Sequence, residues 1–538
     1  MEGEFNLKKN GFMEGAIIAT LAIIISKIMG VLYVIPFYRI IGEQGGALYG
    51  YAYNIYNTFL VISSAGIPLA ISKLTSEYDT KKEYDKKIAM YNIAKKAILI
   101  FSVCSFLVCF LFAKPLAHLI IGEMTGGNSI SDVAFVIRCV SFALLIIPLL
   151  SISRGYLQGH KYIAPSSFSQ VIEQITRIIV IILGSFIALR YLHLPLYIAV
   201  GISVFAACIG GLAGYAYLFF KMRKINTKQE KPINQSERKE IIKKIIAYCV
   251  PFIIINIASN LYNTTDIILL IRGLYKIGYE ATTIETITSI YTTWCNKLVM
   301  IVKSIASGLT ISLIPSIVSS YVNKEKEKVN KYMNKSFKVL LIIILPIVIF
   351  ISLFANEVWS VFYAQSTYGP IILKMQIFLA VFESSYLLIC TAIQGINKTK
   401  LVYTSVITGL TINLALDLPF IFLFNKIGLY PYYGAIAASI IGYSISLIIP
   451  LVILYKKERY NFWGVLINLP KTILSLVFLY IICLLYKNFM PYHYSFIYNI
   501  MYIGIIGVIY VGIYYLINAK AINTLLELNK RRKKWNLK

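Results

Sequence analysis

The chain is a series of apolar segments, most of them long enough to cross a membrane, separated by short polar connections. A helix needs about 20 apolar residues to cross the hydrocarbon core, and on that template the sequence predicts fourteen spans. Their approximate cores are 14–39, 47–72, 88–113, 132–153, 166–189, 195–220, 245–271, 284–319, 337–355, 371–394, 401–424, 433–455, 465–486 and 495–518. No small-residue cleavage site follows the first, which favours a retained span over a signal peptide.

Basic residues gather in alternate connections. The N-terminus, every second connection and the C-terminus together hold 39 of the 52 Lys and Arg residues. Cytoplasmic loops collect such residues, so the pattern predicts an even number of spans with both termini cytoplasmic. We expect a multi-pass protein of the cytoplasmic (plasma) membrane.

Spacings repeat between the two halves of the chain. Ser26 to Arg39 is spaced like Ser259 to Arg272, at an offset of 233, and Gln158-Gly159 corresponds to Gln394-Gly395 at 236. Six spans per repeat put both halves in the same orientation, as in transporters built from parallel repeats. The predicted fold is therefore all-α, with two six-helix lobes and two further C-terminal helices. The domains expected are an N-terminal lobe at 1–222, a cytoplasmic linker at 223–244, a C-terminal lobe at 245–456, and helices 13 and 14 with a basic tail at 457–538.

Composition narrows the class of function. Only 14% of residues are charged, against roughly 25% in soluble proteins. Membrane topology accounts for the net charge of +28, so nucleic-acid binding is not expected. Eight cysteines lie in apolar spans without CxxC spacing, and four histidines are scattered. With no nucleotide-binding or nucleophile motif, the chain reads as a transporter rather than an enzyme.

Three lysines lie not near the ends of predicted spans but deep inside them, where an ionisable side chain is costly and usually functional. Lys27 is at the middle of the first span, Lys297 is at similar depth in the eighth, and Lys303 lies deeper in the eighth. One ammonium from each lobe could grip a phosphate group. A lysine neutralised by a buried carboxylate, or one that snorkels to the interface, remains the alternative.

Other ionisable residues have two open interpretations. Glu173 and Arg177 are four residues apart on one helix face, which favours mutual neutralisation over a role in gating or substrate contact. Glu383 lies at mid-depth, either as the partner of a cavity lysine or as a proton-coupling group.

Two further carboxylates, Asp266 and Asp417, fall in the outer third of the C-terminal lobe, and Asn413 is one turn before Asp417. Hard oxygen ligands of this kind suit Na⁺. Hydrogen bonding between helices is the alternative.

The segments ISKIMGVLYVIPFYRIIG and GALYGYAYNIYNTFLVISSAGIPLAISKL strongly resemble the start of the MurJ and SpoVB (YtgP-like) polysaccharide-biosynthesis branch of the multidrug/oligosaccharidyl-lipid/polysaccharide (MOP) exporter superfamily. The resemblance covers nearly the whole chain. It implies a lipid II flippase of peptidoglycan and cell-wall synthesis, which moves an undecaprenyl-diphosphate-linked precursor to the outer leaflet by alternating access. Membrane lipids and cell-wall synthesis proteins would be its partners.

The resemblance also assigns residues. Ser26-Lys27-x-x-Gly30 matches the family's Ser-Arg-x-x-Gly, and Lys297 falls where the family has an arginine, so Ser26, Lys27 and Lys297 are implied diphosphate contacts. The chain departs from the family at Tyr33, where some members have a second arginine, and Lys303 is a candidate substitute. The family's Na⁺ site resembles Asp266, Asn413, Asp417 and Ser439. No other cofactor is implied.

Three alternatives stay open. A flippase for another polyprenyl-linked glycan, or a sporulation paralogue, would share these features. A cation-coupled drug exporter would be expected to have an acidic cavity and twelve spans, whereas the charges at mid-depth here are mainly basic. A scaffold for envelope synthesis would have no reason to keep buried charges.

Overall fold

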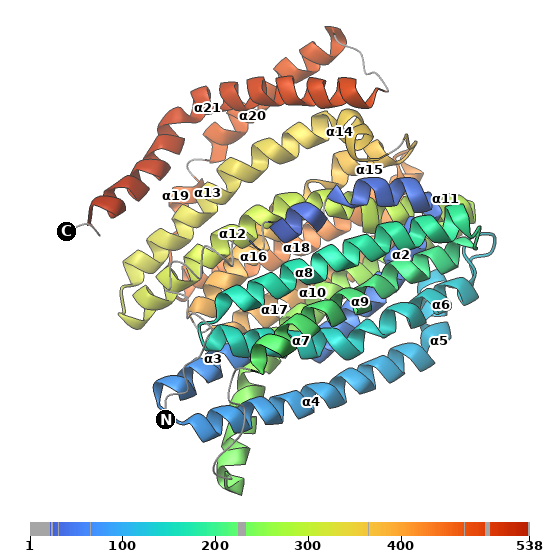
Figure 1. The fold of residues 1–538 in the computed structure, drawn as a ribbon. Coiled ribbons are helices and arrows are strands. Elements are labelled where there is room, and N and C mark those ends of the chain that lie inside the picture. Colours follow the sequence, from blue (N-terminus) through green and yellow to red (C-terminus); the bar gives the residue numbers. More distant parts are fainter. Residues whose placement is uncertain are drawn as a thin grey trace. The chain divides into compact units, whose positions relative to one another are not determined.

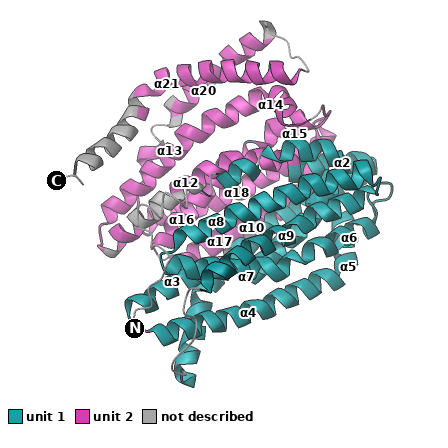
Figure 2. Cartoon of the chain, viewed as in Figure 1, with its two compact units in different colours: residues 1–293 teal, residues 294–538 magenta. Residues whose placement is uncertain are grey.

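A computed structural model describes residues 22, 25–30, 32–64, 66–223, 233–363, 365–396, 398–466, 469–489 and 495–535, all of it helix, turn or short connection (Figure 1). Within these ranges there is no β-strand, which confirms the all-α prediction. Two compact units divide the chain, residues 1–293 and 294–538 (Figure 2).

The first unit contains the helices α2 (Val34–Ser64), α3 (Ile67–Thr80), α4 (Tyr84–Leu111), α5 (Ala113–Ile121), α6 (Ile130–Ser141), α7 (Ala143–Gly159), α8 (Ile163–Ile179), α9 (Leu196–Met222), α10 (Gln235–Ile277) and α11 (Ala281–Ser289). After α8 the helix continues through two π-helical turns, η1 (Val180–Gly184) and η2 (Ile187–Tyr191). A third π-helical segment, η3 (Ile290–Trp294), follows α11.

The second unit contains the helices α12 (Cys295–Val322), α13 (Lys326–Leu353), α14 (Ala355–Phe362), α15 (Gly369–Gln376), α16 (Leu379–Gly395), α17 (Thr399–Lys426), α18 (Pro431–Lys456), α19 (Trp463–Leu466), α20 (Leu469–Phe489) and α21 (Phe496–Trp535).

Ten stretches of the described chain are long and apolar enough to cross a membrane. The first two predicted spans, 14–39 and 47–72, both overlap one of these stretches, Ile25–Ser64, which is kinked at Gly42, where φ is 65°. Predicted spans seven and eight coincide with α10 and with α11 to α12, and span thirteen with the shorter apolar segment Thr472–Lys487. The chain is thus a multi-spanning membrane protein, and the count of fourteen stays a prediction.

The internal repeat extends to the lengths and ends of the helices. Both α4 and α13 have 28 residues, and both α7 and α16 have 17. The turn before α4 places Lys82 at φ 58°, and the turn before α13 places Lys324 at the same φ, 242 residues later. A positive φ is uncommon for lysine, so its recurrence supports two copies of one helical pattern.

The predicted domain boundaries are not set by these units. Helices α10 and α11 belong to the first compact unit, whereas the repeat assigns residues from 245 onward to the second lobe. Of the predicted linker, 224–232 lie outside the described residues, and the chain is helical again from Gln235. The lobe boundaries stay a prediction.

Small residues let helices approach closely in the first unit. A Cβ on Gly155 would lie 2.5 Å from the carbonyl oxygen of Pro68, and one on Gly159 would lie 2.5 Å from the Cβ of Thr75. Both glycines lie four residues apart on α7 and face α3, the small-xxx-small pattern of membrane helix pairs. The close contact holds α3 against the helix that carries the first charged side chain of the site.

Candidate functional site

A buried ion pair joins α7 to α8 in the first unit. The Arg154 guanidinium lies 2.8 Å from the Glu173 carboxylate, with the side chains only 17% and 13% exposed. Arg154 Nε also donates to Ser169 Oγ at 2.8 Å. Glu173 is therefore neutralised across two helices, and the predicted pairing of Glu173 with Arg177 along one helix is wrong in its choice of partner.

Arg177 lies instead against tyrosines of α2. Its guanidinium carbon is 6.0 Å from the ring centroid of Tyr53, at the outer limit of a cation–π contact. Tyr53 stacks on Tyr49 with centroids 5.2 Å apart and contacts Tyr56 at 5.3 Å. An arginine on an aromatic wall keeps its planar donors oriented, which suits recognition of phosphate oxygens.

Lys27 is exposed, and it has no ion pair within the described part of the chain. The neighbouring Ser26 and Gly30 mark the packed face of the same helix. Ser26 Oγ is enclosed without a hydrogen-bond partner among the described residues, and a Cβ on Gly30 would lie 3.4 Å from Gln174 Nε2 of α8. Lys27 is about 100° around the helix from Ser26, so it leaves that packed face. Its role as a phosphate contact stays a prediction.

In the second unit the eighth-span lysines lie on α12. Lys303 forms an ion pair with Glu383 of α16, so Glu383 is the partner of a lysine, as one of its two interpretations expects. Lys297 is partly buried. Six residues separate the two lysines, which places them about 9 Å apart along the helix and on different faces.

A buried polar cluster joins α17 to α18. Asn413 Nδ2 donates to Ser439 Oγ at 3.2 Å and to Asp417 Oδ1 at 3.4 Å. The three residues are 0%, 1% and 0% exposed, in that order. They supply hard oxygen atoms, so this donor set fits Na⁺. The fourth predicted ligand, Asp266, lies in the first unit, where it accepts a hydrogen bond from Tyr291 Oη at 3.0 Å.

Two buried charges escaped the sequence-based prediction. Arg154 directly follows the predicted span 132–153 in a basic connection, and its position at the end of an apolar span is the available signal. Glu285 of α11 is fully buried and accepts the backbone N–H of Asn128 at 2.5 Å. A Cβ on Gly127 would lie 2.6 Å from that carboxylate, so a larger residue in the loop before α6 would displace the Glu285 side chain.

The sequence of the chain matches a known family over more than half of its length. The family model described as polysaccharide biosynthesis protein matches residues 12–321, and a second model, MatE, matches 291–418. The chain belongs to the polysaccharide biosynthesis protein family. The lipid II flippase MurJ of Bacillus subtilis (strain 168) is 32% identical over 476 residues, which are 86% of each chain. The stage V sporulation protein B of the same strain is 28% identical over 40% of each chain.

Solved structures share the fold of this polysaccharide biosynthesis family member. An inward closed conformation of lipid II flippase MurJ aligns with a TM-score of 0.67 at 16% identity, covering 94% of this chain and 100% of that one. An inward-facing multidrug resistance MATE family transporter of the MOP superfamily aligns with a TM-score of 0.64 at 15% identity, covering 82% and 98%. The predicted two-lobe MOP architecture is confirmed. The relatives are transporters rather than enzymes.

Proposed function

We propose that this protein is a lipid II flippase, which moves the undecaprenyl-diphosphate-linked peptidoglycan precursor from the inner to the outer leaflet of the cytoplasmic membrane. The observation that carries the proposal is the 32% identity to a lipid II flippase over 86% of both chains. A likeness of that length includes both halves of the repeat. Basic side chains inside spans supply the charge that an anionic headgroup requires.

In the proposed mechanism Lys27 and Lys297 contact the diphosphate, and Ser26 and Arg177 add hydrogen bonds. Lys303 is held by Glu383. An arriving diphosphate competes with Glu383 for Lys303, and the released carboxylate can take up a proton. Exchange of ion-pair partners is therefore the step that couples substrate binding to a change of conformation.

Glu173 has a different proposed role. Its pair with Arg154 ties α7 to α8 within one unit, so it acts as a gating contact rather than a substrate contact. Burying either charged group is favourable only while the two are paired. Opening the pair would therefore expose both charges together.

We propose further that both termini are cytoplasmic, that Asn413, Asp417 and Ser439 of the second unit bind Na⁺, and that a Na⁺ gradient or the membrane potential returns the empty carrier to its starting state. The concentration of basic residues in alternate connections supports the orientation. The buried oxygen atoms of α17 and α18 support the ion.

Rescue of a bacterial strain depleted of its own lipid II flippase tests the function. The wild-type chain should restore growth and outer-leaflet lipid II, whereas the double variant K27A/K297A, expressed at equal level, should not. K95A removes an exposed lysine of α4 and should rescue fully. Normal export by K27A/K297A would refute the phosphate contacts and leave the flippase assignment standing, while failure of the wild-type chain would refute the assignment.

A second candidate is a flippase for another polyprenyl-linked glycan or a sporulation paralogue, favoured by the likeness to the stage V sporulation protein B. That match extends over 40% of each chain, against 86% for the lipid II flippase. Rescue of a sporulation mutant without rescue of vegetative growth would favour this second candidate.

A further inference from the structure

Helix α10 extends well beyond the thickness of a membrane. Its 43 residues correspond to about 65 Å, roughly twice the hydrocarbon core. The helix starts at a capping box in which Asn234 accepts the backbone N–H of Glu237 at 3.1 Å. Since the apolar span begins near residue 245, the turns from Gln235 to Lys244 lie at the level of headgroups and water.

One face of these first turns is fixed to the rest of the unit. Glu237 lies 3.5 Å from Lys86 of α4, and Lys244 lies 3.5 Å from Glu77 of α3 and 3.0 Å from Glu240. Ile241 is only 1% exposed. The extension is therefore a supported part of the fold rather than a free end, and its opposite face has a defined position.

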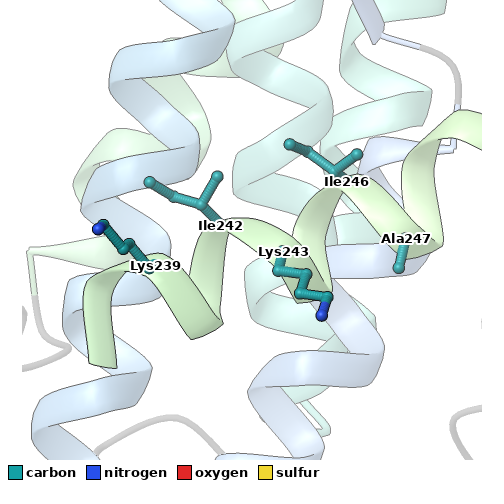
Figure 3. A pocket seen from close by; sticks show the side chains of 5 residues that line it. All are labelled: Lys239, Ile242, Lys243, Ile246 and Ala247. Atoms are coloured by element: carbon teal, nitrogen blue, oxygen red, sulfur yellow. The ribbon is translucent and has the colours of Figure 1, made fainter. Parts of the chain in front are cut away.

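The opposite face is basic and apolar. Five side chains from successive turns line a surface hollow of about 380 Å³ (Figure 3): Lys239, Ile242, Lys243, Ile246 and Ala247. Ile242 and Ile246 are 36% and 54% exposed. Within the described residues neither Lys239 nor Lys243 has an ion pair, unlike Lys244 on the fixed face. Like charges four residues apart destabilise a helix, so an anion bound here would relieve a repulsion.

The apolar stripe continues from this hollow into the membrane span. Val250 and Ile254 follow Ile246 at four-residue intervals and are 42% and 37% exposed. A pair of ammonium groups at one end of an exposed apolar line matches a phospholipid, with its anionic headgroup at the lysines and an acyl chain along the stripe. A soluble anion has no apolar part that would contact the isoleucines.

We propose that the face of α10 formed by Lys239, Ile242, Lys243 and Ile246 binds one anionic phospholipid. The positive-inside pattern assigns it to the cytoplasmic leaflet. The bound lipid completes the charge balance of a helix that is already fixed on its other side. This site uses other residues than the proposed diphosphate contacts. Lipid binding there is therefore a property additional to the proposed flippase function and does not depend on that function.

Native mass spectrometry of the purified full-length protein, titrated with phosphatidylglycerol or phosphatidylcholine, tests the proposal. At about 1 kcal/mol per lysine near an anionic surface, K239Q/K243Q should weaken phosphatidylglycerol binding roughly thirtyfold. K239R/K243R should keep it. The matched control K95Q/K96Q removes two exposed lysines of α4 that are adjacent and therefore on different faces, and it should bind as the wild type does.

Three outcomes would overturn the proposal. Equal loss in K95Q/K96Q would mean that the general surface charge binds the lipid. Equal binding of phosphatidylcholine would exclude selection by the lysines. Glycerol phosphate that competes as well as the intact lipid would mean a site for a soluble anion. Circular dichroism of each variant shows that the helix content is unchanged.

Discussion

At the scale of single residues, ion pairs inside the membrane-spanning part determine which substitutions each unit tolerates. Two charges such as Arg154 and Glu173 are costly to bury, and their attraction repays this cost only while both are present. The Glu383 carboxylate is similarly dependent on Lys303. A single substitution in such a pair leaves a charge without its partner, whereas a double substitution does not.

Glu173→Gln should therefore lower the free energy of unfolding by about 3 to 5 kcal/mol, because it leaves the Arg154 guanidinium without its carboxylate. The double variant R154Q/E173Q should recover most of that stability. Thermal unfolding in detergent measures the first effect, and rescue of the depleted strain measures transport. If the double variant is as unstable as E173Q, the pair found between α7 and α8 is not what stabilises them.

Sequence reasoning at this scale found most of the ionisable residues but not their partners. The rule that residues four apart share a helix face correctly places Glu173 near Arg177, yet Arg154, nineteen residues earlier, provides the ion pair. Partners from different helices depend on helix rotation, which one sequence does not specify. Pairing with a lysine is one of the two interpretations that the sequence leaves open for Glu383, and Lys303 is that lysine.

At the scale of helices, the close contact between α2 and η3 depends on the absence of a side chain at Gly50. A Cβ there would lie 2.6 Å from Thr293 Oγ1 and 2.7 Å from Thr292 Oγ1. Thr293 Oγ1 also donates to the carbonyl oxygen of Gly46 at 3.0 Å, one turn earlier on α2. Lipid provides no hydrophobic driving force for helix association. Hydrogen bonds from hydroxyl groups and close packing at glycines therefore hold these helices together.

Gly50→Val should force α2 and η3 apart and cost about 1 to 3 kcal/mol through overpacking, and it should lower the yield of folded protein. Gly504→Val in α21 is the matched control, since a Cβ at Gly504 has nothing within 4 Å. Size-exclusion profiles and thermal unfolding report both variants. Equal behaviour of the two would show that the contact at Gly50 is not tight.

A group of ion pairs around Glu77 of α3 gives a pH dependence. Lys81 donates a hydrogen bond to Glu77 at 2.8 Å, which with Lys244 holds the pKa of Glu77 below its usual value of 4.5. A depressed carboxyl pKa contributes stability above the unfolded pKa that is lost as pH falls through the folded value. The hydrogen bond to Glu240 raises the pKa of Lys244 above 10.5, so its contribution is lost only in strong alkali.

The wild-type protein should therefore lose up to about 1 kcal/mol more stability than E77Q when the pH falls from 6 to below 4.5. Between pH 5 and 9 the difference between the two should stay constant. Thermal unfolding at a series of pH values measures it. A difference that changes near pH 7 instead would point to another titrating group.

Helix positions were largely predictable from hydropathy, while breaks inside helices were not. The repeat spacing of 236 between Gly159 and Gly395 reappears as the common ends of α7 and α16. The kink at Gly42 lies in the predicted connection between the first two spans, whereas the π-helical turns after α8 fall within an apolar segment that gives no sign of them. Such breaks arise from side-chain packing between helices, and the hydrophobic periodicity of the sequence carries no information about that packing.

At the scale of the whole molecule, exposed apolar side chains show how much of the surface needs lipid. On α20 and α21, Leu474, Val508 and Leu516 are 72%, 74% and 75% exposed. A soluble protein does not expose such large apolar faces, so lipid must cover them. A ligand changes the conformation of a carrier in this environment only if it binds one state better than another. Because such binding stabilises the preferred state, the binding of an ion can be measured as a gain in stability.

Na⁺ should raise the midpoint of thermal unfolding of the purified protein relative to choline at equal ionic strength. At a concentration a hundred times the dissociation constant, the gain is about 2.7 kcal/mol. D417N removes the buried carboxylate beside Asn413 and should abolish the gain, whereas E123Q, which changes an exposed residue, should keep it. If choline and Na⁺ act alike on the wild type, the oxygen cluster of α17 and α18 serves packing alone. Coupling would then have to come from a proton at Glu383 or from the membrane potential, and only transport measured across a pH gradient would separate these two.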